Sequence, residues 1–158
     1  MRTVIHLLLR MISFVCLFGL QALGAQGAYN DPYEVLKLSI PRGKEFFDRA
    51  QNAARSGDSD GLASMVRYPL MVIDQDGKKH QILSRAQLLK KSNSVFDEKV
   101  RNAILCQSFE TLMVSSNGVM LGNGTIWADV SSSGETLEIV TVNRRAARSI
   151  SCAPELPK

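Results

Sequence analysis

The apolar residues of this 158-residue chain change their spacing at Tyr68. Between residues 41 and 66 they recur every three or four positions, as in Phe46, Phe47 and Ala50, which predicts amphipathic helices. From Tyr68 onward most apolar stretches are short and bounded by turn residues, which is typical of strands. Because helices precede most of the strands, we expect an α+β domain.

Local signals place the ends of the predicted helices. Pro41 suits a first helical turn, and Gly57 ends the first helix. Asp58 is a capping residue for a short second helix, and Asp97 opens another helix later in the chain. Ser84 begins a Ser-Arg-Ala-Gln capping box that predicts a helix from residue 85.

Pairs of turn residues predict two hairpins. Asp76-Gly77 separates apolar segments 68–73 and 78–83, and Asn117-Gly118 separates 112–114 from 119–121. The glycines at 122 and 124 are expected to bend or bulge the strand, which resumes over 125–130, and a last strand covers 137–142. The predicted fold is therefore a curved antiparallel sheet with the N-terminal helices packed on one face.

The first 25 residues are typical of a secretory signal peptide. Arg2 precedes the apolar segments 4–9 and 11–20, and small residues follow from Ala22, so cleavage is expected after Gly24, Ala25 or Gly27. The alternative is an uncleaved membrane anchor, but Arg10 leaves the apolar run shorter than the roughly 20 residues that a spanning helix needs. We expect a periplasmic or secreted protein without a membrane span after cleavage.

The processed chain is divided into a lead-in arm, residues 26–40, and a single domain with a C-terminal tail, residues 41–158. The signal segment holds two arginines and no acidic residue, so its removal lowers the formal net charge from +4 to +2. A nucleic-acid partner is not expected, because such binding requires a strongly basic surface.

Two cysteines, Cys106 and Cys152, remain after cleavage. An even number of cysteines in an exported chain predicts a disulfide, which would connect the tail to the end of a helix. The alternative is two separate buried thiols.

Three segments carry a resemblance to a known superfamily. They are 57–70, which contains Gly57-Asp58 and Tyr68-Pro69-Leu70, then 84–88 with Val95-Phe96, and 118–127, which ends in Ile126-Trp127. Together they resemble exported bacterial members of the NTF2-like (cystatin-like, SnoaL-like) superfamily over residues 41–143. The resemblance implies a cone whose concave sheet and helices enclose a pocket. Some members are isomerases, dehydratases or cyclases, and many only bind ligands or partners.

Candidate chemistry rests on Asp129, Tyr68 and Trp127. Asp129 and Trp127 are two residues apart on a predicted strand, so they share a face, and a buried carboxylate beside an indole could act as a base. Tyr68 could supply a hydroxyl to the same pocket. The alternative is that Trp127 and Asp129 face solvent, or that Trp127 belongs to the core and Asp129 ends its strand.

The remaining polar residues predict no cofactor and no metal. With the signal removed, His80 is the only histidine, and its position beside a tight turn predicts a solvated surface role. Lys90-Lys91 and Arg144-Arg145 with Arg148 could attract an acidic partner, although such groups usually lie on solvated faces.

The preferred function is an exported binding or accessory domain without catalysis, which holds a small apolar ligand or a protein partner, with a homodimer as one assembly. One alternative is a cofactor-free isomerase or hydrolase-like enzyme using Asp129 with Tyr68. The other is an envelope accessory or immunity-type protein that acts through its surface, as a filled cone with an exposed apolar patch would favour.

Overall fold

The computed structural model describes residues 31–149. The expected signal peptide, the first part of the lead-in arm and Cys152 lie outside the described residues. Within residues 31–149, no helix is both long and apolar enough to cross a membrane.

Four α-helices lie in this part of the chain: α2 (Ile40–Ser56), α3 (Ser59–Ser64), α4 (Arg85–Val95) and α5 (Glu98–Leu105). Pro41 stands in the first turn of α2, and Gly57 ends it with a φ of +69°. Asp58, Ser84 and Asp97 are the N-cap residues of the other three helices, and each accepts a hydrogen bond from a backbone N–H three residues ahead. The predicted caps are confirmed.

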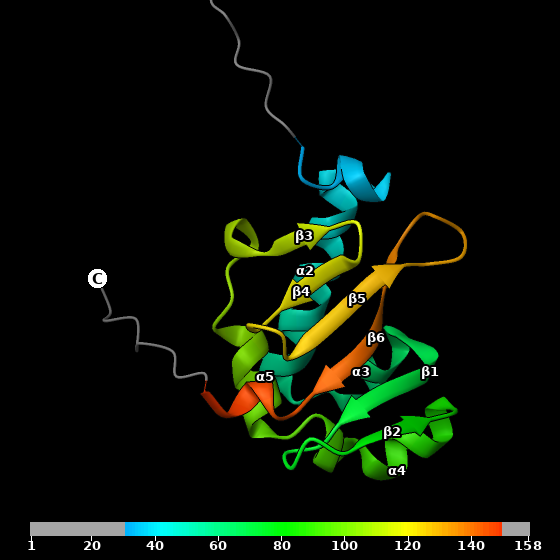
Figure 1. Ribbon diagram of the computed structural model, residues 1–158, viewed down its shortest axis with the longest axis vertical. Coiled ribbons are helices and arrows are strands. Elements are labelled where there is room, and N and C mark those ends of the chain that lie inside the picture. Colours follow the sequence, from blue (N-terminus) through cyan, green and yellow to red (C-terminus); the bar gives the residue numbers. More distant parts are fainter. Residues whose placement is uncertain (1–30, 150–158) are drawn as a thin grey trace, which may run out of the picture. The chain divides into compact units, whose positions relative to one another are not determined.

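The α+β class is also confirmed. Six strands form one curved sheet that does not close into a barrel: β1 (Val66–Ile73), β2 (Lys79–Ile82), β3 (Met113–Ser115), β4 (Gly118–Leu121), β5 (Ile126–Val130) and β6 (Leu137–Asn143). Their order is β2-β1-β6-β5-β4-β3, so the first and last strands in sequence are neighbours inside the sheet (Figure 1).

The sheet is mixed, which corrects the prediction of antiparallel pairing throughout. β1 and β6 run parallel, with Met71 opposite Thr141 and Val72 opposite Val142, while the other pairs are antiparallel. Hairpin signals determine the pairing of strands that adjoin in sequence. The direction of β6 beside β1 depends instead on where four intervening strands bring the chain, which no local signal records.

A second correction concerns Gly122 to Gly124. The φ values of Gly122, Asn123 and Gly124 are +58°, +49° and +87°. Three consecutive left-handed residues reverse the chain, so this segment is the turn between antiparallel strands β4 and β5 and not a bulge in one strand. The shift in register lies further along the sheet, where β6 holds one extra residue opposite Trp127 and Ala128.

One contiguous cluster of buried side chains lies between the helices and the sheet. Phe46 on α2 and Ile104 on α5 belong to it, together with Ile126 and Ile139 from the sheet. Its largest fully buried members are Phe96, Leu62, Leu70, Ile82, Leu88, Ile104, Leu121, Ile126, Ile139, Val72, Val100 and Val119. The expected interior of the cone is therefore occupied by side chains of the protein itself.

Aromatic rings hold the start of the described chain. Tyr33 precedes the short 3-10 helix η2 (Glu34–Leu36), and its ring stacks on Phe109 of η3 (Phe109–Thr111) with centroids 5.9 Å apart. Gly43 of α2 lies directly under the Tyr33 ring, where a Cβ would collide. The later part of the lead-in arm is thus packed against the domain.

Candidate functional site

Tyr68 and Asp129 have separate partners on different sides of the sheet. The Tyr68 hydroxyl donates to the Ala63 carbonyl at 3.3 Å, and the ring packs against the core cluster. Burial, opposed in part by Arg85, raises the pKa of Tyr68 above its ordinary value, so the phenol stays protonated at neutral pH. This geometry gives Tyr68 a packing role.

Asp129 forms an ion pair with Arg67. Its Oδ2 accepts from the Arg67 guanidinium at 2.7 Å, and the two side chains are 43% and 39% exposed. Arg67 also donates to the Val130 carbonyl at 3.1 Å. A half-exposed carboxylate that already has a cationic partner is poorly suited to act as a base. The structure does not bring Asp129 and Tyr68 together.

Trp127 lies on the same face as Asp129, as strand alternation predicts, but that face is not the interior. The alternate residues of β5, Ile126 and Ala128, are the ones buried against the helices, at 1% and 0% exposure. Trp127 is half-buried on the opposite face of the sheet. Both side chains of this pair therefore lie on the face of the sheet away from the helices, as the solvent-facing alternative expects.

A polar group that local sequence signals did not indicate lies beside the first hairpin. We name Asp74, His80, Asp97 and Arg144 the hairpin cluster. Arg144 donates to Asp74 at 3.1 Å and to Asp97 at 2.9 Å, and His80 Nδ1 lies 3.2 Å from the second oxygen of Asp74. The side chain of Arg144 is only 18% exposed.

The cluster changes two expectations. His80 is paired with a carboxylate and is not simply a solvated surface residue. Arg144 was expected on a solvated basic face, but its guanidinium pairs with two carboxylates. Lys90 and Lys91 are exposed, as expected. The side chain of Arg148 lies outside the described part of the structure.

The electrostatics of the Asp97–Arg144 pair favour its charged state. Burial alone would raise the pKa of Asp97, but hydrogen bonds from Arg144 and from the Val100 N–H outweigh it and hold that pKa below its ordinary value. Through the two hydrogen bonds of Arg144, the cluster joins the hairpin turn, the start of α5 and the end of β6. This geometry gives the cluster a structural role, because it connects three segments of the fold.

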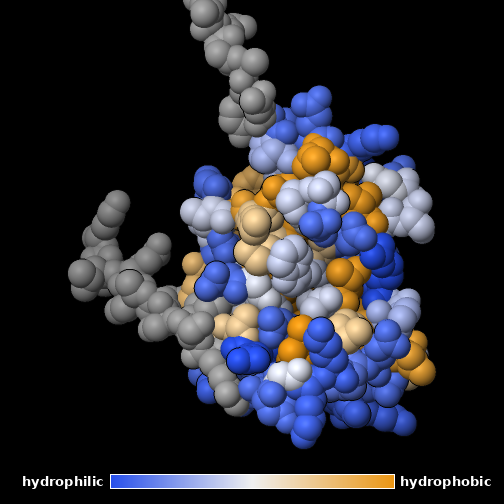
Figure 2. All heavy atoms as spheres, viewed as in Figure 1, coloured by the Kyte–Doolittle hydropathy of each residue, from blue (hydrophilic) through white to orange (hydrophobic). Residues whose placement is uncertain are grey.

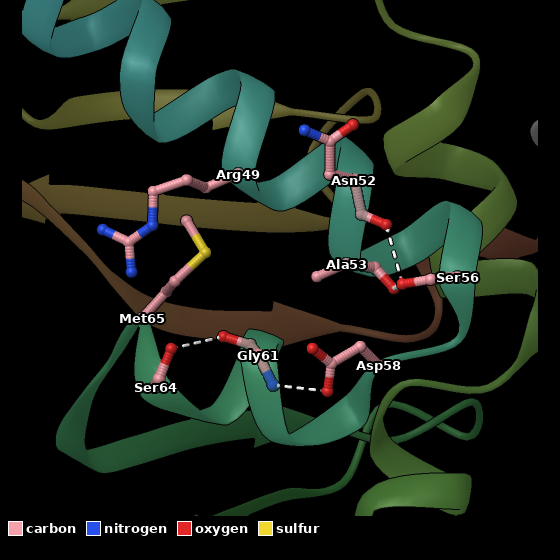
Figure 3. A pocket seen from close by; sticks show the side chains of 8 residues that line it. All are labelled: Arg49, Asn52, Ala53, Ser56, Asp58, Gly61, Ser64 and Met65. Carbon is pink, nitrogen blue, oxygen red and sulfur yellow. Dashed lines mark hydrogen bonds between the residues drawn. The ribbon is translucent and has the colours of Figure 1, made fainter.

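The described surface contains a polar hollow between α2 and α3, with a volume of about 260 Å³. We call it the α2–α3 hollow; Figure 3 shows its lining residues, which are Arg49, Asn52, Ala53, Ser56, Asp58, Gly61, Ser64 and Met65. Its floor includes Ala53 and Met65, which belong to the core cluster, and no sequence motif indicated the hollow. Among residues 31–149, no group of three or more His, Cys, Asp or Glu is placed to hold a metal ion.

The side of the sheet away from α2 carries a row of large side chains. Strand register places them opposite one another across all six strands, in the order Met113, Met120, Trp127, Thr141, Met71 and Gln81. We call the first five the open-face row. Met113 is 53% exposed, and the other four are half-buried. Figure 2 shows apolar residues between hydrophilic ones on this side of the molecule.

Comparisons with protein families, curated proteins and solved structures find no match to this chain. The arrangement of its own residues is therefore the basis for inferring its function.

Proposed function

We propose that the protein is an exported, NTF2-like binding or accessory domain that acts through its surface and holds a protein partner, without catalysis. The observation that carries this proposal is the open-face row. Outward positions on a sheet that faces water are usually polar. Here methionine and tryptophan occupy those positions on four of the six strands.

The composition of the row suits a binding surface. Methionine is flexible and polarisable, so Met71, Met113 and Met120 can adapt to a partner. Trp127 at the middle of the row is of the residue type most enriched in binding hot spots. Charged residues lie to either side of the row, with Arg67 and Asp129 toward one end of the strands and Lys79 toward the other.

The alternatives have less support. A small apolar ligand inside the cone would need space that the core cluster occupies. An isomerase or hydrolase-like enzyme would need Asp129 and Tyr68 in one cavity, and their partners differ. The export, the localisation and the superfamily remain part of the proposal, supported by the sequence patterns.

The test compares two lysine substitutions of apolar residues in chemical cross-linking with extracts of the source cell envelope. Met120→Lys places a charge in the centre of the open-face row. Leu89→Lys is the matched control, because Leu89 is a 38% exposed apolar residue on α4, within the helical layer. We expect partner cross-links that map to β4 and β5 to be lost in Met120→Lys and retained in Leu89→Lys.

A partner that binds Met120→Lys as well as the wild-type chain would contradict the proposal. Sedimentation velocity over a range of concentrations determines whether the partner is a second copy of the chain. Native mass spectrometry of the purified protein would reveal a retained small molecule, which would favour the apolar-ligand alternative.

A further inference from the structure

The α2–α3 hollow has opposite charges at its two ends. Arg49 from α2 lies at one end beside Met65, and Asp58 lies with Ser56 at the other (Figure 3). Between them the lining includes Ala53 and Met65, which are 8% and 5% exposed. The hollow is therefore a short apolar floor between a cation and an anion.

Arg49 is available to a ligand. Among the described residues its guanidinium has no hydrogen-bond or ion-pair partner, whereas Arg42 pairs with Glu45 at 3.2 Å and Arg55 donates to Asn52 at 3.2 Å. A guanidinium presents two parallel N–H groups that match the oxygens of a carboxylate. The free cation at this end thus suits a carboxylate.

The other end offers hydrogen-bond acceptors. Asp58 Oδ1 accepts from the Gly61 N–H at 2.8 Å, and Oδ2 lies over Gly61, where a Cβ would come within 2.5 Å of it. Ser56 at the same end donates its hydroxyl proton to backbone carbonyls, which leaves its oxygen able to accept. A carboxylate with a hydroxyl oxygen at the same end suits an ammonium group.

Gly61 supports this interpretation because its backbone does not require glycine. Its φ is outside the left-handed range, and glycine weakens a helix relative to alanine. What glycine provides here is space for the Asp58 carboxylate at the wall of the hollow.

We propose that the α2–α3 hollow binds a small zwitterion of the amino-acid or dipeptide class. The carboxylate contacts Arg49, the ammonium contacts Asp58, and the short chain between them lies over Ala53 and Met65. The volume of about 260 Å³ is below the usual range for drug-sized ligands, so the ligand is small. This site is independent of the open-face row.

The test is an NMR titration of the ¹⁵N-labelled processed chain with glycylglycine, with acetate and ethylammonium as single-charge probes. We expect saturable shifts of amides in α2 and α3 with glycylglycine, and binding at least about tenfold weaker with either single-charge probe. Arg49→Gln and Asp58→Asn should each weaken dipeptide binding about tenfold or more, while Arg42→Gln should not.

The substitutions at Asp58 are chosen to preserve the fold. Asparagine caps helices as well as aspartate does, so Asp58→Asn removes the charge and retains the cap; Asp58→Ser, which also caps, replaces it if the first variant does not fold. Absence of saturable shifts, acetate binding as tight as the dipeptide, or unchanged binding by Arg49→Gln would each overturn the proposal. Met120→Lys should bind glycylglycine normally, which separates this result from the test of the proposed function.

Discussion

The Arg144 guanidinium lies 2.9 Å from Asp97 Oδ2 and so joins the end of β6 to the N-cap of α5 across 47 residues of sequence. The same guanidinium donates to Asp74 at 3.1 Å, and the Arg144 backbone N–H donates to the Ile73 carbonyl. One residue therefore connects the first hairpin, the last strand and a helix. The hairpin cluster is expected to contribute to stability more than an exposed ion pair would.

Asp97→Asn should lower the free energy of unfolding by about 1–3 kcal/mol at pH 7. Asparagine can still cap α5, so the loss reports the ion pair with Arg144 and not the cap. Urea denaturation followed by circular dichroism measures it. Asp76→Asn is the control, because Asp76 pairs with Lys78 while both remain largely exposed, and we expect no measurable change there. Equal effects of the two substitutions would show that the cluster contributes nothing specific.

The same substitution has a defined pH dependence. The pKa of Asp97 in the folded protein is below its value of about 3.9 in an unfolded chain. Its stabilisation is therefore present above about pH 4 and is lost as pH falls through the folded pKa. The stability curves of wild-type protein and Asp97→Asn should converge in acid. A constant difference from pH 7 to pH 2 would contradict this assignment.

Local features of the fold could be predicted from the sequence, because a few neighbouring residues determine them. Asp58, Ser84 and Asp97 cap helices where their side chains reach backbone N–H groups three residues ahead. Gly77, with a φ of +89°, provides the predicted hairpin turn.

Long-range relationships could not be predicted in the same way. Strand alternation correctly places Trp127 and Asp129 on one face, but only the position of the helices decides which face is inside. Likewise, Arg144 reaches Asp74 over 70 residues because β1 and β6 lie side by side, and no spacing in the sequence records that contact.

Gly118 and Gly134 allow the cost of replacing a glycine through close packing to be compared with the cost through backbone conformation alone. Both have a positive φ, +110° and +77°, but a Cβ on Gly118 would collide with the Ala128 carbonyl oxygen, while nothing lies within 4 Å of one on Gly134. Gly134→Ala should cost about 1 kcal/mol through conformation alone. Gly118→Ala should cost more, about 3 kcal/mol or above, because β4 must move from β5. Thermal denaturation of both variants checks the ranking, and similar melting temperatures would contradict it.

Ionisation of the Tyr33 hydroxyl should destabilise the protein in alkaline solution. Burial, with a smaller contribution from Asp31, raises the pKa of its hydroxyl to about 12, above the ordinary value of 10.0. The stabilisation linked to the protonated phenol is fully present below about pH 10 and is lost as pH rises toward 12. Tyr33→Phe should remove about 1 kcal/mol of alkaline loss at pH 11.

At neutral pH the same variant should be as stable as wild type, because the buried Tyr33 hydroxyl has no hydrogen-bond partner among the described residues. Urea denaturation at pH 7 and at pH 11 tests both statements. A large loss at pH 7 would indicate that the hydroxyl has a partner.

The disulfide between Cys106 and Cys152 stays a prediction, since Cys152 lies outside the described residues. Cys106 lies at the end of α5, so the bond would fix the C-terminal tail to that helix. Closing a loop of about 45 residues should contribute about 4 kcal/mol in the chain-entropy model. Mass spectrometry of the exported protein without reductant should give a mass two hydrogens below that of the reduced form, with a peptide that joins both cysteines. Alkylation of both thiols in the unreduced, denatured protein would exclude the bond, and the same spectrum would locate the signal cleavage site.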